Sequence, residues 1–234
     1  MAMATSQLFI FLHISTCFLL PSSLHANNDP AVDASRFSFS FNFSDESSYR
    51  AGSDDLLFEG SASPPQGNLV DLTCNKLGKE INSCAGRMSY GHPVALHDSA
   101  TTASFSTRFT FAIVAAGDGA PGDGIAFFLS GYPSAMPPYS FGGHLGLVNP
   151  NATTAYGVGQ FLAVEFDTYK NRWDPNPSHI GVDVNSVLSW NTTVLPILTN
   201  NGTITATIQF NGTTGMLVTS LRFHDRPSFA PVVF

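Results

Sequence analysis

The densest group of ligand-type side chains lies in one short segment of the sequence. Its members are Glu165, Asp167, Tyr169 (through its carbonyl), Asn171, Asp174 and His179. The oxygen donors Asp167, Tyr169, Asn171 and Asp174 are of the kind that calcium prefers. Glu165, Asp167, Asp174 and His179 include an imidazole nitrogen, which suits a transition ion such as manganese. The segment therefore predicts a site for two divalent cations, with Asp167 and Asp174 shared between them.

A solvated acidic loop beside an unrelated histidine has the same residue types, and spacing alone leaves this alternative open. An EF-hand loop is excluded, because the glycine at the sixth position and the closing glutamate are absent. The elements around the segment decide whether its side chains can meet. Residues 161–166 are a short apolar run, which predicts a strand with Glu165 and Asp167 on one face. Pro175 and Pro177 predict a loop, and residues 179–184 predict the next strand.

The rest of the chain is typical of an all-β protein. Apolar residues alternate or cluster in short runs that are separated by turn residues, and no window holds three turns of helical periodicity uninterrupted by Gly or Pro. The predicted strands cover residues 37–43, 104–113, 124–129, 161–166, 179–184, 204–210 and 216–223. The last two flank residues 211–215, which have the composition of a hairpin turn. Strands at this spacing predict one domain with an antiparallel β-sandwich fold.

Composition narrows the class of protein further. The chain has 234 residues, with 10 Lys and Arg against 17 Asp and Glu, a formal net charge of −7. Charged residues make up 12% of the chain and hydrophobic residues 43%, which argues against disorder and against a coiled coil. The acidic balance, without a Lys/Arg cluster, argues against a nucleic-acid partner. No membrane-spanning stretch is visible after the first twenty residues.

The N-terminus predicts export. An apolar run over residues 8–20 is followed by small residues up to Ala26, which is typical of a secretory signal peptide over residues 1–26. The alternative is an N-terminal strand, and no Lys or Arg precedes the apolar run. Cys17 would be removed with the signal, and in an exported chain the remaining pair, Cys74 and Cys84, predicts one disulfide. Zinc binding is the other use of two cysteines, but two more ligands at zinc-finger spacing are missing.

Five sequons predict N-glycosylation at the surface, and they begin at Asn42, Asn151, Asn191, Asn201 and Asn211. The C-terminus ends inside a new apolar run, residues 230–234. A sandwich must pair or protect its edge strands, so we expect the domain over residues 27–234 to be incomplete at its C-terminus.

Several motifs together resemble the legume (L-type) lectins. They are residues 164–186, with the pattern Val-Glu-Phe-Asp-Thr-Tyr-x-Asn-x-Trp-Asp-Pro-x-x-x-His-Ile-Gly-Val-Asp-Val-Asn-Ser, and residues 86–94, 103–113, 123–129 and 142–149. The resemblance covers most of the mature chain and is closer to the ectodomains of plant L-type lectin receptor kinases, without a kinase. It implies a concanavalin A-like jelly roll, which the truncation would leave short of its C-terminal strands.

The resemblance also implies a role for individual residues. It assigns calcium and a transition ion such as manganese to the ligands named above, with Ser189 orienting a metal-bound water. It assigns sugar contacts to the Asp123 carboxylate, the Gly143 N–H, the Asn171 amide and the Tyr169 ring. A carboxylate accepts hydrogen bonds from sugar hydroxyls, and an aromatic ring covers the apolar face of a sugar. The peptide bond before Asp123 is expected to be cis, although Gly122 stands where the family usually has Ala.

The leading hypothesis is a non-catalytic lectin that binds glycans or glycoproteins outside the cell. We expect it in the apoplast, or at the plasma membrane if the full-length gene continues into a receptor kinase. A jelly-roll glycoside hydrolase is the first alternative. Retaining hydrolysis needs two carboxyl groups about 5–5.5 Å apart, and the strand with Glu165 and Asp167 lacks the second Glu of that pattern. The second alternative is a truncated fragment of a receptor ectodomain that binds no glycan. Useful avidity for glycans would need a homodimer or a larger oligomer.

Overall fold

The computed structural model describes residues 6–10, 13–19, 37–45, 54–74, 83–96, 101–115, 122–152, 154–195, 198, 202–225 and 232–233. The strands are β1 (Ser6–Ile10), β2 (His13–Leu19), β3 (Phe37–Asn42), β4 (Leu56–Gly60), β5 (Val70–Asp71), β6 (Gly86–Tyr90), β7 (Ser104–Ala115), β8 (Gly124–Ser130), β9 (Phe161–Asp167), β10 (His179–Val184), β11 (Asn191–Val194), β12 (Ile204–Phe210), β13 (Leu217–Phe223) and β14 (Val232–Val233). Two short 3-10 helices, η2 (Gly142–His144) and η3 (Gly157–Gly159), lie between β8 and β9. The all-β prediction is confirmed.

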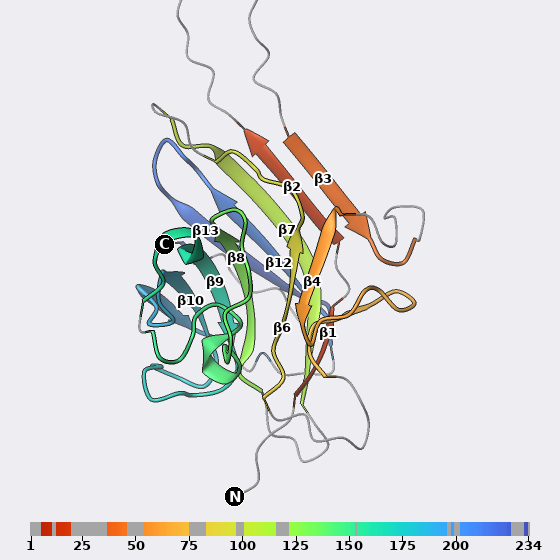
Figure 1. Cartoon of the computed structure of the whole chain (residues 1–234), viewed down its shortest axis with the longest axis vertical. Coiled ribbons are helices and arrows are strands. Elements are labelled where there is room, and N and C mark those ends of the chain that lie inside the picture. Colours follow the sequence, from red (N-terminus) through yellow and green to blue (C-terminus); the bar gives the residue numbers. More distant parts are fainter. Residues whose placement is uncertain are drawn as a thin grey trace, which may run out of the picture.

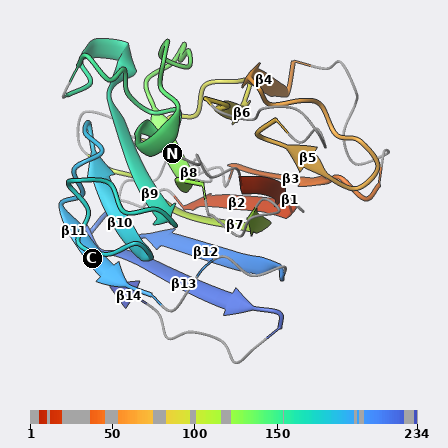
Figure 2. The same ribbon diagram turned by 90° about the horizontal axis from the view of Figure 1, so that it is seen from below.

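The strands form two main antiparallel sheets and a ribbon. The larger sheet has eight strands, in the order β14-β13-β12-β7-β1-β5, with β2 also paired to β7 and β3 paired to β2. The second has four, in the order β11-β10-β9-β8, and β4 pairs with β6 in a separate ribbon. Figures 1 and 2 show the four-stranded sheet lying over the larger sheet, with the ribbon beyond β8. This is the predicted antiparallel sandwich.

Aromatic side chains fill the space between the two sheets. Phe109 and Phe111 of β7 pack against Phe166 of β9, with ring centroids 6.0 and 5.3 Å apart. Ile180 of β10 and Ile208 of β12 are fully buried in the same cluster. Burial of each such side chain stabilises the fold by about 1.5–3 kcal/mol. This core holds the inner face of β9 and β10 in place, so the opposite face of both strands can carry polar groups.

The predicted strands agree closely with the observed ones. All seven are present, and the hairpin turn between β12 and β13 closes with hydrogen bonds from Gly215 N to Asn211 O (2.8 Å) and from Asn211 N to Met216 O (2.9 Å). The prediction missed β4, β5, β6, β11 and β14. These strands are short, and β4 and β6 pair only with each other in the described part of the chain. A two-stranded ribbon with partly open faces does not impose the strict alternation that marks a strand in sequence.

The segment that we predicted as a signal peptide forms β1 and β2 in this structure. β2 pairs with β3 and β7, and β1 pairs with β5 and β7. This arrangement matches the N-terminal strand alternative. It does not test whether the segment is removed on export, so the signal peptide stays a prediction. No helix in the described part of the chain is long and apolar enough to cross a membrane.

The two remaining cysteines are joined, as expected. Cys74 and Cys84 form a disulfide with their Cα atoms 5.7 Å apart. Four sequon asparagines, Asn42, Asn151, Asn191 and Asn211, are exposed, which is the accessibility that glycosylation requires. Asn201 lies outside the described residues. Glycosylation itself stays a prediction.

A cavity of about 560 Å³ lies between the β4–β6 ribbon and β8. Its lining includes Met88 and Tyr90 of β6 and Phe127 and Leu129 of β8. No Asp, Glu, Lys or Arg is among the described residues that line it. The cavity is therefore apolar, and it is separate from the ligand-type side chains.

Candidate functional site

The pairing of β9 with β10 brings the predicted ligands together. His179 lies opposite Asp167 and Gly181 lies opposite Glu165 in the register of the two strands. Because side chains alternate between faces, Glu165, Asp167 and His179 share the face that points away from the core. One ligand atom from each lies within 4.8 Å of the others, and all three residues are buried. Spacing and alternation predicted this face correctly.

Small residues on the neighbouring strands leave room for the Glu165 carboxylate. Gly181 of β10 and Ala126 of β8 flank Glu165 on the same face. A Cβ atom at Gly181 would lie 2.9 Å from Glu165 Cγ and would also collide with the Glu165 carboxylate and the Ser189 hydroxyl. The sequence therefore needs glycine at this point of β10.

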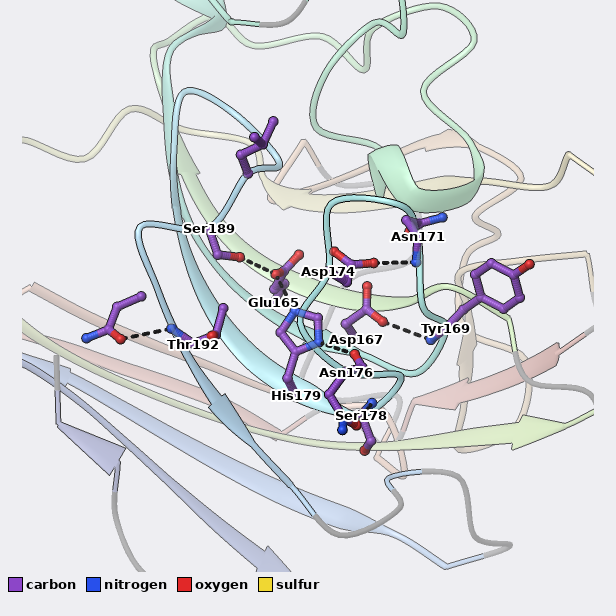
Figure 3. A network of polar contacts seen from close by, with 12 residues as sticks. Glu165, Asp167, Tyr169, Asn171, Asp174, Asn176, Ser178, His179, Ser189 and Thr192 are labelled. Carbon is purple, nitrogen blue, oxygen red and sulfur yellow. Dashed lines mark hydrogen bonds and ion pairs between the residues drawn. The ribbon is translucent and has the colours of Figure 1, made fainter.

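Hydrogen bonds fix the orientation of the acid and the imidazole (Figure 3). His179 Nδ1 lies 3.0 Å from the carbonyl oxygen of Asn176, and His179 Nε2 lies 3.1 Å from Glu165 Oε1. The Ser189 hydroxyl donates a hydrogen bond to Glu165 Oε1. A histidine that gives its Nδ1–H to a backbone carbonyl presents Nε2 to a metal ion. The arrangement fits the transition ion that the sequence predicted.

The loop after β9 folds back over the same face and supplies further oxygen atoms. The Asn171 N–H donates to Asp174 Oδ2 (2.6 Å), and the Tyr169 N–H donates to Asp167 Oδ1 (2.8 Å). Asp174 is buried, but it lies outside the compact group of Glu165, Asp167 and His179. The side-chain oxygen of Asn171 is buried and has no hydrogen-bond partner. A buried oxygen without a partner is costly unless a cation or water satisfies it, so this atom fits a calcium ligand.

The electrostatics of the cluster favour a bound cation. Burial raises the pKa of Asp167 to about 8, and the charges of Asp174 and Glu165 contribute in the same direction. Burial also raises the pKa of Asp174. Burial alone would lower the pKa of His179, but its hydrogen bond to Glu165 and the Glu165 charge outweigh burial, so the pKa is raised. Carboxylates that resist ionisation when crowded together ionise readily around divalent cations.

Asp183 is a member of the cluster that sequence reasoning did not assign. It is fully buried, and neither carboxylate oxygen has a hydrogen-bond partner. Burial, followed by the charge of Glu165, raises its pKa to about 8. Alternation along β10 placed Asp183 on the same face as His179, and this was the signal that could have found it.

The residues expected to contact sugar also converge, at the edge of the cluster. The side chains of Asp123 and Asn171 are hydrogen-bonded, and burial outweighs this bond and raises the pKa of Asp123. The Gly142–Gly143 turn faces both of them. A Cβ atom at Gly142 would lie 3.7 Å from Asp123 Oδ2, and one at Gly143 would lie 2.6 Å from Asn171 Cγ. The structure thus brings Asp123, Gly143 and Asn171 together.

Two expectations for the sugar site do not agree with the structure. They concern the ring of Tyr169 and the peptide bond before Asp123. The Tyr169 side chain is 46% exposed, and its ring points away from the acidic cluster in Figure 3. The expected cis peptide between Gly122 and Asp123 is wrong for this structure, in which Tyr132–Pro133 is the one cis bond among the described residues. Thr168 contacts both residues of this peptide, because its hydroxyl donates to Gly122 O (2.6 Å) and its N–H donates to Asp123 O (2.9 Å).

Comparison with known proteins agrees with the geometry. Residues 36–231 match the family model for the legume lectin domain. The chain is 40% identical to agglutinin-2 of Cladrastis kentukea over 185 residues, which cover 77% of this chain and 62% of the relative. It is 38% identical over 185 residues to a lectin-related protein of the same plant, covering 78% of this chain and 59% of the relative. The chain therefore spans about six tenths of the length of these relatives.

A solved structure of a legume lectin is also similar to this chain. The winged bean acidic lectin complexed with methyl-α-D-galactose superposes with a TM-score of 0.69 at 32% identity, covering 83% of this chain and 79% of that chain. These relatives are lectins rather than hydrolases, so the comparisons favour the non-catalytic prediction over the glycoside hydrolase alternative.

Proposed function

The chain belongs to the legume lectin family, and we propose that it binds glycans without chemically changing them, at a site formed by Asp123, Gly143 and Asn171. The observation that carries the proposal is the convergence of these three residues from separate loops beside a buried acidic cluster. A shallow site with a carboxylate, an amide and a backbone N–H offers both acceptors and donors to sugar hydroxyls. The winged bean lectin described above is complexed with methyl-α-D-galactose, which makes galactosides the first ligands to test.

Each residue has a distinct task in this proposal. The Asp123 carboxylate accepts hydrogen bonds from two sugar hydroxyls, and bonds to a charged acceptor contribute about 1.5–3 kcal/mol each. The Asn171 Nδ2 group and the Gly143 N–H donate to sugar oxygens. The exposed ring of Tyr169 would cover the apolar face of the sugar by turning toward Asn171, its near neighbour in the loop.

We further propose that calcium and a transition ion such as manganese bind beside the sugar site. Asp167, the Tyr169 carbonyl, Asn171 and Asp174 would hold calcium, while Glu165, Asp167, Asp174 and His179 would hold the transition ion, with Ser189 behind it. The ions supply positive charge that neutralises the carboxylates and fixes the loop. The buried, unpartnered Asn171 side-chain oxygen supports this assignment, because its orientation also sets the direction of the Asn171 Nδ2 group.

A glycan panel tests the proposed function directly. The protein is loaded with calcium and manganese and presented to immobilised α-galactosides, α-mannosides and complex plant N-glycans. We expect saturable binding to at least one class and no release of free sugar. Asp123→Ala should abolish the binding while the melting temperature stays near that of the wild type. Asn171→Ala should abolish the binding and also lower the melting temperature of the metal-loaded protein, because Asn171 is a proposed calcium ligand. Unchanged affinity in either variant would refute the site, and sugar release would support the hydrolase alternative.

Several properties of the whole protein are proposals of the same kind. We propose that residues 1–26 direct export, that the mature chain acts in the apoplast or at the cell surface, and that its exposed sequons carry glycans. N-terminal sequencing of protein secreted from plant cells tests the first point, and an N-terminus near residue 27 is the expected result. Self-association into a dimer, measured by analytical ultracentrifugation, would supply the avidity that single shallow sites lack.

A further inference from the structure

An ion pair between a buried arginine and a partly exposed glutamate lies outside the proposed ligand site, on the β4–β6 ribbon. Glu59 of β4 and Arg87 of β6 are direct cross-strand partners, with Arg87 Nε 3.1 Å from Glu59 Oε2. Arg87 is 6% exposed. The guanidinium group also lies over the Phe128 ring of β8, 4.5 Å from its centroid. The pair therefore lies where the ribbon meets β8 of the four-stranded sheet.

Both members of the pair hold the loop that follows β8. Arg87 donates one hydrogen bond to the carbonyl oxygen of Ala135 (3.4 Å) and another to the Ser134 hydroxyl. Glu59 Oε1 accepts the N–H of Met136 (2.7 Å). Three consecutive loop residues are thus bound by two side chains that also bind each other. An ion pair by itself is weak evidence for stability. In this pair, the other hydrogen bonds that Arg87 and Glu59 make all go to the loop after β8.

The bound loop continues directly into the Gly142–Gly143 turn. Met136 lies between two glycines, because a Cβ atom at Gly60 would lie 2.8 Å from its methyl carbon and one at Gly146 would lie 4.0 Å from its sulfur. Within the loop, the Gly146 N–H donates to Ser140 O (2.7 Å), and the buried Ser140 hydroxyl donates to Pro137 O (2.6 Å). These contacts link the clamped residues to the turn that faces Asp123 and Asn171.

We propose that Glu59 and Arg87 form a clamp that positions the Gly143 turn for glycan binding. Neither residue touches the proposed sugar site, so both act as positioning residues. The inference rests on the proposed function, because the turn is one wall of that site. Removing an outer-shell residue that orients a metal ligand typically lowers metal affinity or activity about 10–100-fold, and we expect an effect at the lower end of this range for residues that orient a sugar-binding turn. Arg87 supplies three of the contacts of the clamp and is the better residue to change.

Arg87→Met is the first variant, because it keeps the apolar stem of Arg87 and removes the guanidinium group. Its matched control is Arg108→Met, at an exposed arginine of β7 that contributes nothing to the loop. We expect Arg87→Met to weaken glycan affinity about tenfold or more, with calcium still raising the melting temperature as in the wild type. The control should bind as the wild type does. A dissociation constant for Arg87→Met within twofold of the wild-type value would overturn the proposal.

A second variant separates positioning from stability. Arg87→Lys keeps the charge opposite Glu59, but an ammonium group cannot make the forked contacts to Ser134 and Ala135. We expect it to recover the melting temperature while glycan affinity stays low, whereas a purely structural role predicts that both recover together. If Arg87→Met does not fold, Ser134→Ala removes one acceptor of the fork and should weaken binding a few-fold.

Amide hydrogen exchange distinguishes failure of the clamp from failure of the proposed function. The amide of Leu145, which donates to Gly142 O (3.0 Å), should exchange faster in Arg87→Met than in Arg108→Met or the wild type. Equal exchange would refute the clamp whatever the protein binds. Faster exchange in a protein that binds no glycan would instead leave the clamp in place and refute the proposed function.

Discussion

Replacing Gly143 by alanine tests the proposed glycan site with a single methyl group. The new Cβ atom would lie 2.6 Å from Asn171 Cγ and 2.8 Å from Asn171 Nδ2, well inside van der Waals contact. Gly143 does not have a positive φ, so alanine adopts its backbone conformation without strain. The effect must therefore come from displacement of the Asn171 side chain, which is hydrogen-bonded to Asp123.

The size of the effect follows from the contacts that are lost. Overpacking by one methyl group costs about 1–3 kcal/mol where the neighbour cannot move freely, and a lost hydrogen bond costs about 1 kcal/mol more. Because a tenfold change in affinity corresponds to about 1.4 kcal/mol, a total of about 2–4 kcal/mol should lower glycan affinity about 30–700-fold. Calcium affinity should fall as well, since the displaced Asn171 side chain is also a proposed calcium ligand.

Isothermal titration calorimetry of the metal-loaded protein measures both affinities. Gly159→Ala is the matched control, because a Cβ atom there meets nothing within 4 Å and its φ is not positive. The control should bind glycan as the wild type does. If Gly143→Ala and Gly159→Ala bind with the same dissociation constant, Asn171 and Gly143 do not form one site, and the reasoning fails.

Three further predictions concern charge and metal. Asp123→Asn keeps the shape of the side chain but removes its charge, and should weaken glycan binding at least tenfold with an unchanged circular dichroism spectrum. Removing the ions with EDTA should lower the melting temperature by several degrees, because ligands that bind only the folded state stabilise it by about 2.7 kcal/mol at one hundred times Kd; an unaltered melt would count against the metal site. The metal-free protein should lose stability as pH rises, because the pKa values of Asp167 and Asp183 are raised to about 8 above the unfolded value of about 3.9. Their protonated forms stabilise the fold fully below about pH 4, and this stabilisation is lost as the pH rises from about 4 to about 8. Thermal melts at pH 5 and pH 8 in EDTA check the sign, and equal or higher stability at pH 8 would contradict it.

The sequence predicted the shared face of Glu165, Asp167 and His179 correctly because these residues are close together in the β9–β10 hairpin. Glu165 and Asp167 are two apart on one strand, and His179 opens the antiparallel neighbour, so alternation alone fixes their shared face. The aromatic core was equally predictable, because strands such as residues 104–113 carry their buried side chains at strict period two. The family resemblance added Asp123 and Gly143, which no local pattern connects to Asn171.

The contacts that sequence reasoning missed are either non-local or set by the conformation of a loop. Arg87 meets Ala135 across 48 positions of the chain, and no residue near either one signals that contact. Strand alternation placed Asp183 on the correct face, but it did not indicate which residues surround the carboxylate. Those depend on how the loop carrying Ser189 closes over the strand. The ring of Tyr169 was expected at the sugar site on the family pattern, whereas its direction is set by the local fold of a loop whose backbone is fixed by Asp167.

The central claim is that divalent cations bound at Glu165, Asp167, Asn171, Asp174 and His179 hold Asn171 in a glycan-binding orientation. The most direct measurement is a glycan titration of one protein sample in three states: loaded with calcium and manganese, chelated, and reloaded. We predict saturable binding in the first state, none in the second, and full recovery in the third. The same dissociation constant in the chelated state, with the ions verified absent by elemental analysis, would contradict the account.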